Sequence, residues 1–273
     1  MTPEKYCQNK AAPPGSSLYY SFLFLPPEKR QAVTALFALR DELDDIADGD
    51  PDVAPIKLAW WQTEIEAMFA DRAQHPAGRQ LAPAIKRYRL PESGFAEMLS
   101  SAESDIAKTR FADYSALAAY CGLAGGAPAR LSAAVFGYHD PSTVNAIVEL
   151  GSSLRLAEII VAIGHDAGRG RLYLPTTELR EFDVRVGDIF HRNNSESYKR
   201  LMEFQLMRAR AELKQAVAQI PAIDRKAQRP TLIRAALATA LLAEIAAGPE
   251  AVLRERVALT PLRKLWIAWK TRS

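Results

Sequence analysis

Five acidic residues crowd the segment from Asp41 to Asp48, and two of them have the spacing of neighbours on a helix face. Asp44 and Asp48 are four residues apart, so on an α-helix both would project from one face, about 6 Å apart along the axis. Like charges at this spacing repel, whereas Mg²⁺ binds carboxylate oxygens and often shares them with substrate phosphates. The pair is therefore interpreted either as a Mg²⁺ site or as a solvated acidic helix end.

A second segment repeats this pattern and leads into a basic loop. Glu158, Ala162 and Asp166 stand at i, i+4 and i+8, so two carboxylates share one helix face with a gap between them. They could hold a metal ion across a cavity from Asp44 and Asp48, or they could be ordinary charges near a helix end. The loop that follows carries Arg169 and Arg171, whose guanidiniums could bind phosphate in a bidentate manner or pair with nearby carboxylates.

The elements that position these residues are predicted to be helices, because apolar residues recur three or four apart and no segment alternates strongly. Proline and glycine fall mostly between the helical segments, and no linker is long enough to separate two domains. We therefore expect one all-α domain over residues 1–273. The expected helices cover 27–48, 56–69, 79–88, 91–108, 113–121, 126–136, 141–164, 176–182, 195–219 and 230–247.

Composition excludes several classes of protein. Lys+Arg 35 against Asp+Glu 32 gives a net charge of +3, which is too small a surplus to indicate a nucleic-acid partner. The two cysteines cannot form a disulfide framework, so a cytoplasmic location is expected. The start of the chain lacks the apolar core of a signal peptide, and the most apolar stretch is broken by Arg234.

Taken together, these motifs make the chain resemble the squalene/phytoene synthase family, and most closely the bacterial presqualene-diphosphate synthases of hopanoid biosynthesis. The resemblance covers nearly the whole chain. It implies an isoprenoid synthase-type helical bundle with a central cavity, in which two prenyl diphosphates are joined head to head. The segments that carry it are Gly15–Pro27, Asp44–Asp48, Lys57–Trp61, Gly170–Pro175, Gln228–Pro230 and Leu259–Trp269.

The same resemblance implies roles for individual residues. Asp44, Asp48 and Asp166 match catalytic aspartates of the family, and the implied cofactor is Mg²⁺, which would neutralise the leaving diphosphate of a farnesyl-type substrate. Metal ligands are expected to be Asp44, Asp48, Glu158 and Asp166. Contacts to the substrate diphosphate are expected from Ser17, Arg40, Arg169, Arg171 and Tyr173.

The chain departs from the family pattern where the second metal site is expected. Ala162 stands where the family has an aspartate, and Glu158 restores the number of carboxylates one helical turn away, about 5.4 Å along the axis. Near the first motif, Asp41 replaces a diphosphate-contacting arginine, although Arg40 is adjacent. Three interpretations therefore stay open: a Mg²⁺-dependent prenyl transferase with a divergent site, a catalytically silent assembly or binding factor, and an isoprenoid carrier.

The tail from Leu262 to Arg272 is basic and aromatic. It is interpreted either as a contact with an anionic membrane surface, which would make the protein peripheral to the inner membrane, or as a segment that packs back on the bundle. The oligomeric state is open, a homo-oligomer included.

Overall fold

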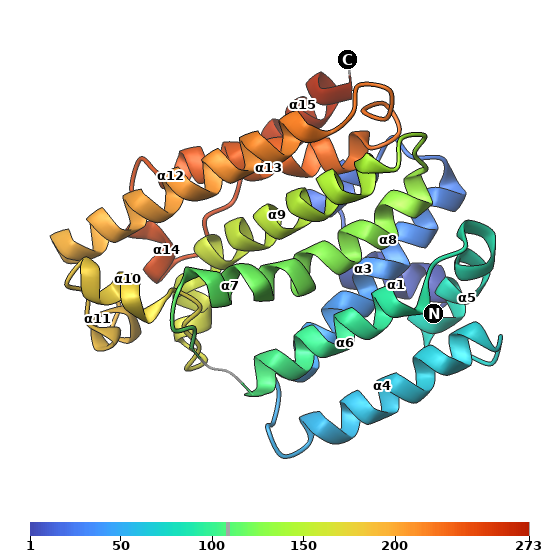
Figure 1. The fold of residues 1–273 in the computed structure, drawn as a ribbon, viewed down its shortest axis with the longest axis horizontal. Helices are drawn as coiled ribbons and strands as arrows, with labels where there is room; N and C mark the ends of the chain where they lie inside the picture. Colours follow the sequence, from blue (N-terminus) through green and yellow to red (C-terminus); the bar gives the residue numbers. More distant parts are fainter. Residues whose placement is uncertain (108–109, 273) are drawn as a thin grey trace.

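The computed structural model describes residues 1–107 and 110–272, and its regular structure is helical (Figure 1). Within those residues the only β-type pairing is an isolated bridge between Arg110 and Leu172. The elements are α1 (Pro3–Ala11), α2 (Ser17–Phe22), α3 (Pro27–Ala47), α4 (Ala54–Phe69), α5 (Pro76–Tyr88), α6 (Glu92–Ala107), α7 (Tyr114–Cys121), the π-helix η1 (Gly122–Gly126), α8 (Ala127–Phe136), α9 (Ser142–Ala167), α10 (Thr176–Glu181), α11 (Val186–Phe190), α12 (Glu196–Gln219), α13 (Arg229–Ile245), α14 (Ala251–Arg254) and α15 (Pro261–Arg272).

The all-α fold and the ten long helical segments expected from the spacing of apolar residues are confirmed, with ends that differ by a few residues. The helix expected over 91–108 is described from Glu92 to Ala107, and residue 108 lies outside the described residues. Apolar spacing did not indicate the shorter helices α1, α2, α11 and α14, nor α15. The glycine-rich run Gly122–Gly126 continues α7 into α8 as a single π-helical turn.

Helix α9 is the centre of the bundle. In Figure 1 it lies between α12 and α13 on one side and α7 and α8 on the other, with α6 and α4 stacked beyond. It packs on α12, η1, α8 and α13, and its buried residues occur on all sides of the helix, from Thr143 to Ala167. An α-helix with this pattern belongs inside a bundle. Helix α3 is the second buried rod and packs on α1, α5, α6 and α8.

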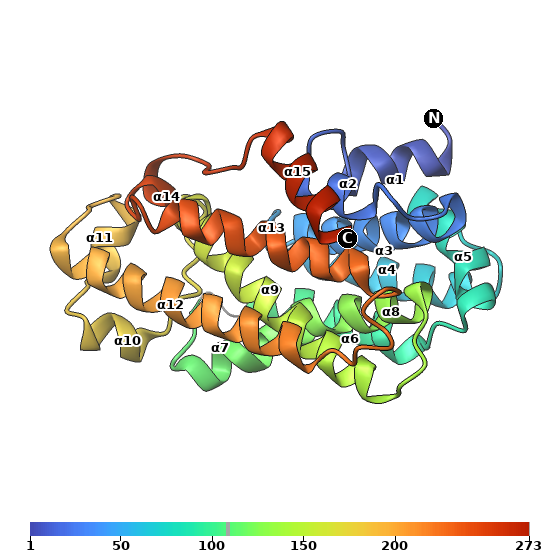
Figure 2. The same cartoon turned by 90° about the horizontal axis from the view of Figure 1, so that it is seen from above.

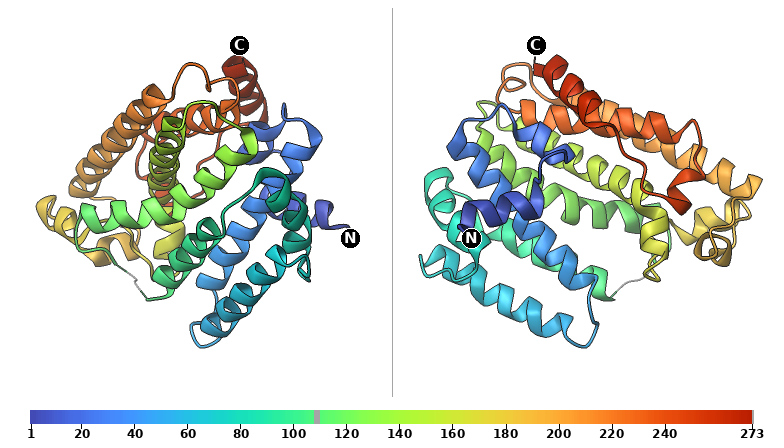
Figure 3. Two further views of the ribbon diagram at one scale, coloured as in Figure 1. Left: turned by 45° about the vertical axis from the view of Figure 1, so that its right-hand side comes forward. Right: turned by 180° about the vertical axis from the view of Figure 1, so that it is seen from behind.

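The two rods carry the acidic motifs, and α13, α2 and α15 cover them from one side. Figure 2 shows α13 and α15 beside α2, and the view from behind in Figure 3 shows α15 lying along α13. Contacts between α13 and α15, α13 and α2, and α15 and α2 agree with this arrangement. Within the described residues, no helix combines the length and the apolar character that crossing a bilayer requires.

A buried carboxylate joins two turns at one end of the bundle. Asp224, between α12 and α13, accepts hydrogen bonds from the backbone N–H groups of His139 (2.7 Å) and Asp140 (2.9 Å) and from the Thr143 hydroxyl (2.6 Å). Although burial opposes ionisation, these donors lower the pKa of Asp224 below its usual range. The α12–α13 turn is thereby fixed to the start of α9.

Two glycines allow η1 and α9 to cross closely. A Cβ at Gly125 would overlap the carbonyl oxygen of Gly151, and a Cβ at Gly151 would overlap Ala129. Both clashes involve atoms of the backbone or of a short side chain, so no flexible side chain can move aside. Gly122, in the same π-helical turn, has open space at its Cβ position.

We therefore expect Gly125→Ala to lower the free energy of unfolding by about 3 kcal/mol, as for overpacking of a close contact. The matched variant Gly122→Ala should change it by less than about 0.5 kcal/mol or stabilise slightly, because alanine is the better helix former. Denaturant unfolding followed by circular dichroism measures both values. Equal effects of the two substitutions would contradict the proposed close approach.

Candidate active site

A cavity of about 890 Å³ opens between the two rods and the helices that cover them. Its apolar lining comes chiefly from α9, α13 and the segment around α14, including Leu154, Val161, Leu237, Leu241 and Leu253. Its polar lining includes the predicted residues Ser17, Arg40, Asp44 and Glu158. The central cavity expected from the family resemblance is thus present, with charged groups and hydrocarbon surface in one space.

The centre of the polar wall is Glu158, whose carboxylate faces three arginines from three helices. Its oxygens lie 3.5 Å from Nη1 of Arg40 on α3, 3.6 Å from Nη1 of Arg155 on α9 and 3.4 Å from Nη2 of Arg234 on α13. We call these four residues the Glu158 cluster. Glu158 was expected as a metal ligand, and in this structure guanidiniums surround its carboxylate.

The electrostatics of the cavity wall give Glu158 and the neighbouring Asp41 different pKa values. Burial favours the neutral form of Glu158, but the guanidiniums of Arg40, Arg234 and Arg155 outweigh it and lower the pKa to about 2. Burial raises the pKa of Asp41 to about 6, although Arg40 donates a hydrogen bond to it at 3.0 Å. Glu158 is therefore the permanent counter-ion of the arginines, while Asp41 titrates below neutral pH.

Asp44 is the acidic residue of the first motif that faces the cavity without a close partner. Its carboxylate lies 3.8 Å from Nε of Arg40 and 4.0 Å from Nη1 of Arg155, which are long ion pairs, and it makes no hydrogen bond. Its side chain is 33% exposed. Within the described residues, its carboxylate oxygens are therefore held at the cavity wall only by long ion pairs.

Asp48, one turn further along, is bound by the basic loop. Arg169 forms an ion pair with one of its oxygens, and Nη1 of Arg171 lies 3.3 Å from the other. Arg171 also donates to the carbonyl oxygen of Ala47. Of the alternatives that the sequence left open for Arg169 and Arg171, pairing with nearby carboxylates is what the structure shows. None of the three side chains belongs to the cavity lining.

Tyr173 was expected to bind diphosphate, and in this structure it lies outside the lining of the cavity. Its side chain is buried, and its hydroxyl donates to Asp105 at 2.8 Å. Tyr120 donates to the other oxygen of Asp105 at 2.7 Å and accepts from Nη2 of Arg155 at 2.6 Å. A buried network thus connects the Glu158 cluster to the basic loop, and Tyr173 positions Arg171 at 3.3 Å instead of contacting the cavity.

Asp166 lies at the end of α9, outside the cavity lining, and its carboxylate interacts with Nδ1 of His165 at 3.3 Å. Burial raises the pKa of Asp166 above its ordinary value, and the carboxylate of Asp48 is one of the charges that add to this effect. The two aspartates are therefore near enough to influence each other. Arg169, which pairs with Asp48, belongs to the loop that directly follows Asp166.

These positions test whether the residues fit Mg²⁺. In residues 1–107 and 110–272, no group of three or more Asp, Glu, His or Cys side chains is arranged to hold a metal ion. The donor chemistry fits at Asp44, because Mg²⁺ is often held by one or two carboxylates together with substrate phosphates. It does not fit at Glu158, where the arginines hold the carboxylate.

Sequence reasoning missed the cations that are free to bind an anion. Arg192, Arg254 and Arg256 line the cavity, and none of them forms an ion pair in the described structure. Lys264 on α15 joins them and donates to the carbonyl oxygen of Gly15 at 2.9 Å. No spacing rule indicated the three arginines, because they lie at or just after the ends of the short helices α11 and α14. Arg155 was detectable, since it precedes Glu158 by three residues on one helix face.

The sequence is similar to that of known synthases over almost its full length. A family model described as squalene/phytoene synthase matches residues 11–263. The 15-cis-phytoene synthase of Synechocystis sp. is 28% identical over 281 residues, which cover 96% of this chain and 83% of that protein. The phytoene synthase of Mycobacterium tuberculosis is 29% identical over 257 residues, or 92% of this chain and 84% of the relative.

Solved structures share the fold. A dehydrosqualene synthase in complex with a ligand superposes with a TM-score of 0.87 at 19% identity, covering 99% of this chain and 95% of that one. Squalene synthase HpnC from Alicyclobacillus acidocaldarius superposes with a TM-score of 0.76 at 24% identity, covering 89% of this chain and 92% of that one. Because these identities are low, the structural similarity supports the helical architecture alone.

The Glu158 cluster leads to a stability prediction. Glu158→Gln leaves three guanidiniums without their shared counter-ion, and we expect the free energy of unfolding to fall by about 1–3 kcal/mol at pH 7. The expected loss is smaller than for a fully buried pair because the Glu158 side chain is 38% exposed. The folded-state pKa is lowered, so the stabilisation is present above about pH 4.5 and declines as the pH falls towards 2. Denaturant unfolding at several pH values measures this.

The control is Glu149→Gln, an exposed position on the same helix, which should change the free energy of unfolding by less than about 0.5 kcal/mol. A Glu158→Gln protein as stable as the wild type at pH 7 would show that the arginines do not need this carboxylate.

Proposed function

Because the chain belongs to the squalene/phytoene synthase family, we propose that it joins two allylic prenyl diphosphates head to head, with farnesyl diphosphate as the substrate. The product would be presqualene diphosphate; a squalene-type hydrocarbon would in addition need a hydride donor. The observation that carries the proposal is the cavity, which places unpaired cations and a free carboxylate beside an extended apolar lining. A diphosphate with a hydrocarbon tail has the complementary distribution of charge and apolar surface.

The cations of the cavity support binding of the diphosphate. Arg192, Arg254 and Arg256 are available for charge-assisted hydrogen bonds to phosphate oxygens. Nε of Arg155 is a buried donor with no hydrogen-bond partner, and an unsatisfied buried donor costs about 1–3 kcal/mol. An anionic ligand that accepts this hydrogen bond would remove the cost.

The apolar lining supports the chemistry that follows binding. When one substrate loses diphosphate, the C–O electron pair leaves with it and an allylic cation remains. The double bond of the second substrate captures this cation, and the new cation loses a proton to the departing diphosphate as the cyclopropane ring closes. Leu154, Val161, Leu237, Leu241 and Leu253 surround the space with hydrocarbon and keep water from the cation. Mg²⁺ bound with the substrate would neutralise the leaving group, and Asp44 is the residue that we propose as its ligand.

We expect Asp44→Asn to lower the rate of product formation from farnesyl diphosphate about 100-fold or more, because it removes the free carboxylate of the cavity. Asp45→Asn is the matched control: its neighbouring carboxylate is exposed, pairs with Lys10 at 2.6 Å and does not line the cavity. Mass spectrometry of reaction extracts, with Mg²⁺ and with a chelator, gives the rates. Equal rates for the two variants would exclude the proposed role of Asp44.

A second candidate is a protein that binds an isoprenoid without turning it over, either as a carrier or as an assembly factor. The Glu158 cluster favours this candidate, because ion pairs occupy a place where the family pattern expects metal ligands. Tight binding of farnesyl diphosphate without product at high protein concentration would support it. Rescue of a deletion phenotype by Asp44→Asn would lead to the same conclusion, since that variant lacks the proposed ligand.

A membrane contact through α15 would bring the protein to a hydrophobic substrate. Leu262, Leu265, Trp266 and Trp269 recur at helical spacing and are exposed, the two tryptophans by 56% and 58%. Lys270 lies over the ring of Trp266, 5.1 Å from its centroid. An apolar aromatic face beside basic residues is typical of helices that lie in the interface of anionic membranes.

We therefore expect Trp266→Ala/Trp269→Ala to reduce binding to phosphatidylglycerol vesicles about tenfold, since interfacial aromatic residues anchor such helices. Trp60→Ala is the control, because Trp60 is also exposed, by 45%, but lies on α4. Vesicle sedimentation measures the bound fraction. A loss of binding in the Trp60 variant alone would place the contact on another surface.

A further inference from the structure

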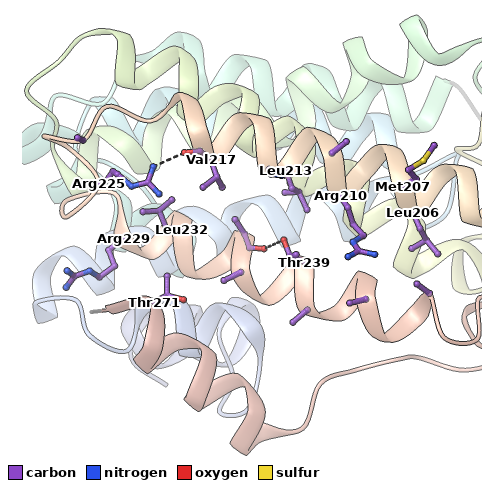
Figure 4. Close-up of a pocket in the computed structure, with 18 of the residues that line it drawn as sticks. Leu206, Met207, Arg210, Leu213, Val217, Arg225, Arg229, Leu232, Thr239 and Thr271 are labelled. Atoms are coloured by element: carbon purple, nitrogen blue, oxygen red, sulfur yellow. Dashed lines mark hydrogen bonds between the residues drawn. The ribbon is translucent and has the colours of Figure 1, made fainter.

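A second large concavity lies outside the active site, between α12 and α13 (Figure 4). Its volume is about 1210 Å³, and it shares no lining residue with the central cavity. This groove is therefore a separate surface, which the proposed function does not use.

The floor of the groove is apolar and made of small residues. On α13 it consists of Leu232 and a row of alanines interrupted by Thr239, and on α12 it includes Leu206 and Leu213. The Thr239 hydroxyl donates to the carbonyl oxygen of Ala235 at 2.8 Å, so it does not need a partner from outside. The short side chains of α13 leave open the space that larger residues would fill.

Charge is unevenly distributed along the groove. The lining contains five basic side chains and one acidic side chain, Glu203. Figure 4 shows Arg225 and Arg229 together at one end, Arg210 part of the way along, and Leu206 and Met207 at the other end. Lys226 lies in the same turn as Arg225, while Glu203 precedes Leu206 on α12. The groove thus has a cationic end at Arg225 and Arg229, while its other end combines Leu206 and Met207 with the charged residues Glu203 and Arg210.

The length of the floor matches a hydrocarbon chain. From Leu232 to Ala246 the rise of α13 is about 21 Å at 1.5 Å per residue. One leaflet of a bilayer has a hydrocarbon thickness of about 15 Å, half of the full core. A lipid chain therefore fits within the groove, and the phosphate of its head group would lie at the Arg225–Arg229 end.

We propose that the groove between α12 and α13 binds a single anionic lipid, with its phosphate head group at the cationic end and its hydrocarbon chain along the alanine-lined floor. An acidic partner helix fits the charges less well, because it would need cations along both walls and would meet Glu203 at the far end. Thr271 of α15 also lines the groove, so the site adjoins the helix that we propose to contact the membrane. A bilayer is accordingly the source of the lipid.

The test uses the full-length protein and palmitoyl lysophosphatidic acid, kept below its micelle concentration, in isothermal titration and native mass spectrometry. We expect saturable binding of one molecule per chain. Monopalmitoylglycerol, which has the chain without the phosphate, should bind about tenfold more weakly or worse, and inorganic phosphate should not compete at equal concentration. Equal affinity for the neutral lipid, or binding only to intact vesicles, would overturn the proposal.

Two pairs of variants locate the site. Ala243→Trp fills the floor at an exposed position, and the control Ala218→Trp changes an exposed alanine of α12 outside the groove. Lys214→Glu/Lys226→Glu reverses two charges of the groove, and its control is Lys57→Glu on α4. We expect each groove variant to weaken binding about tenfold and each control to leave it unchanged.

A further variant separates this site from the active site. Ala162→Trp obstructs the central cavity and should reduce use of farnesyl diphosphate while leaving binding of lysophosphatidic acid unchanged. If Ala162→Trp abolishes lipid binding and Ala243→Trp does not, the lipid occupies the central cavity and the groove proposal fails. A variant with weakened binding counts as folded if the midpoint of its thermal unfolding equals that of the wild type.

Discussion

The ion cluster around Glu158 is the interaction on which the architecture of the active site depends. Arginines from α3, α9 and α13 meet at one carboxylate, so the helices that form the cavity wall are tied through a single acidic residue. Three guanidiniums would otherwise repel one another in a space of reduced dielectric. In this structure guanidiniums surround that carboxylate, whereas the carboxylate of Asp44 faces the cavity with long ion pairs only.

The same constraint extends to the basic loop. Arg155 contacts Glu158 and also donates to Tyr120, which shares Asp105 with Tyr173. Tyr173 in turn lies beside Arg171, the residue that pairs with Asp48. Charges that could have contacted a diphosphate are thus committed to holding the fold, and the free cations of the cavity come from the segments around α11 and α14. In the described structure, one set of arginines thus forms ion pairs around the cavity, whereas Arg192, Arg254 and Arg256 line the cavity without such pairs.

Apolar spacing was sufficient to predict the long helices of the bundle, because each buries a periodic stripe or is apolar on all sides. It failed for α1, α2, α11 and α14, which are too short or too polar to show a period. Apolar spacing also did not predict the π-helical turn Gly122–Gly126, in which Gly125 closely approaches Gly151 on another helix. Residues distant in the chain define that contact.

The sequence alone determined the family, the helical class and the two acidic segments, because these depend on residue types and on spacing within single helices. It placed Asp44 and Glu158 on the helices that line the cavity. Only the tertiary structure decided which charges meet: Glu158 with arginines from three helices, Asp48 with the basic loop, and Tyr173 with Asp105 instead of the cavity. Coulomb interactions and hydrogen bonds act over a few ångströms, so their partners are fixed by how helices pack rather than by order along the chain.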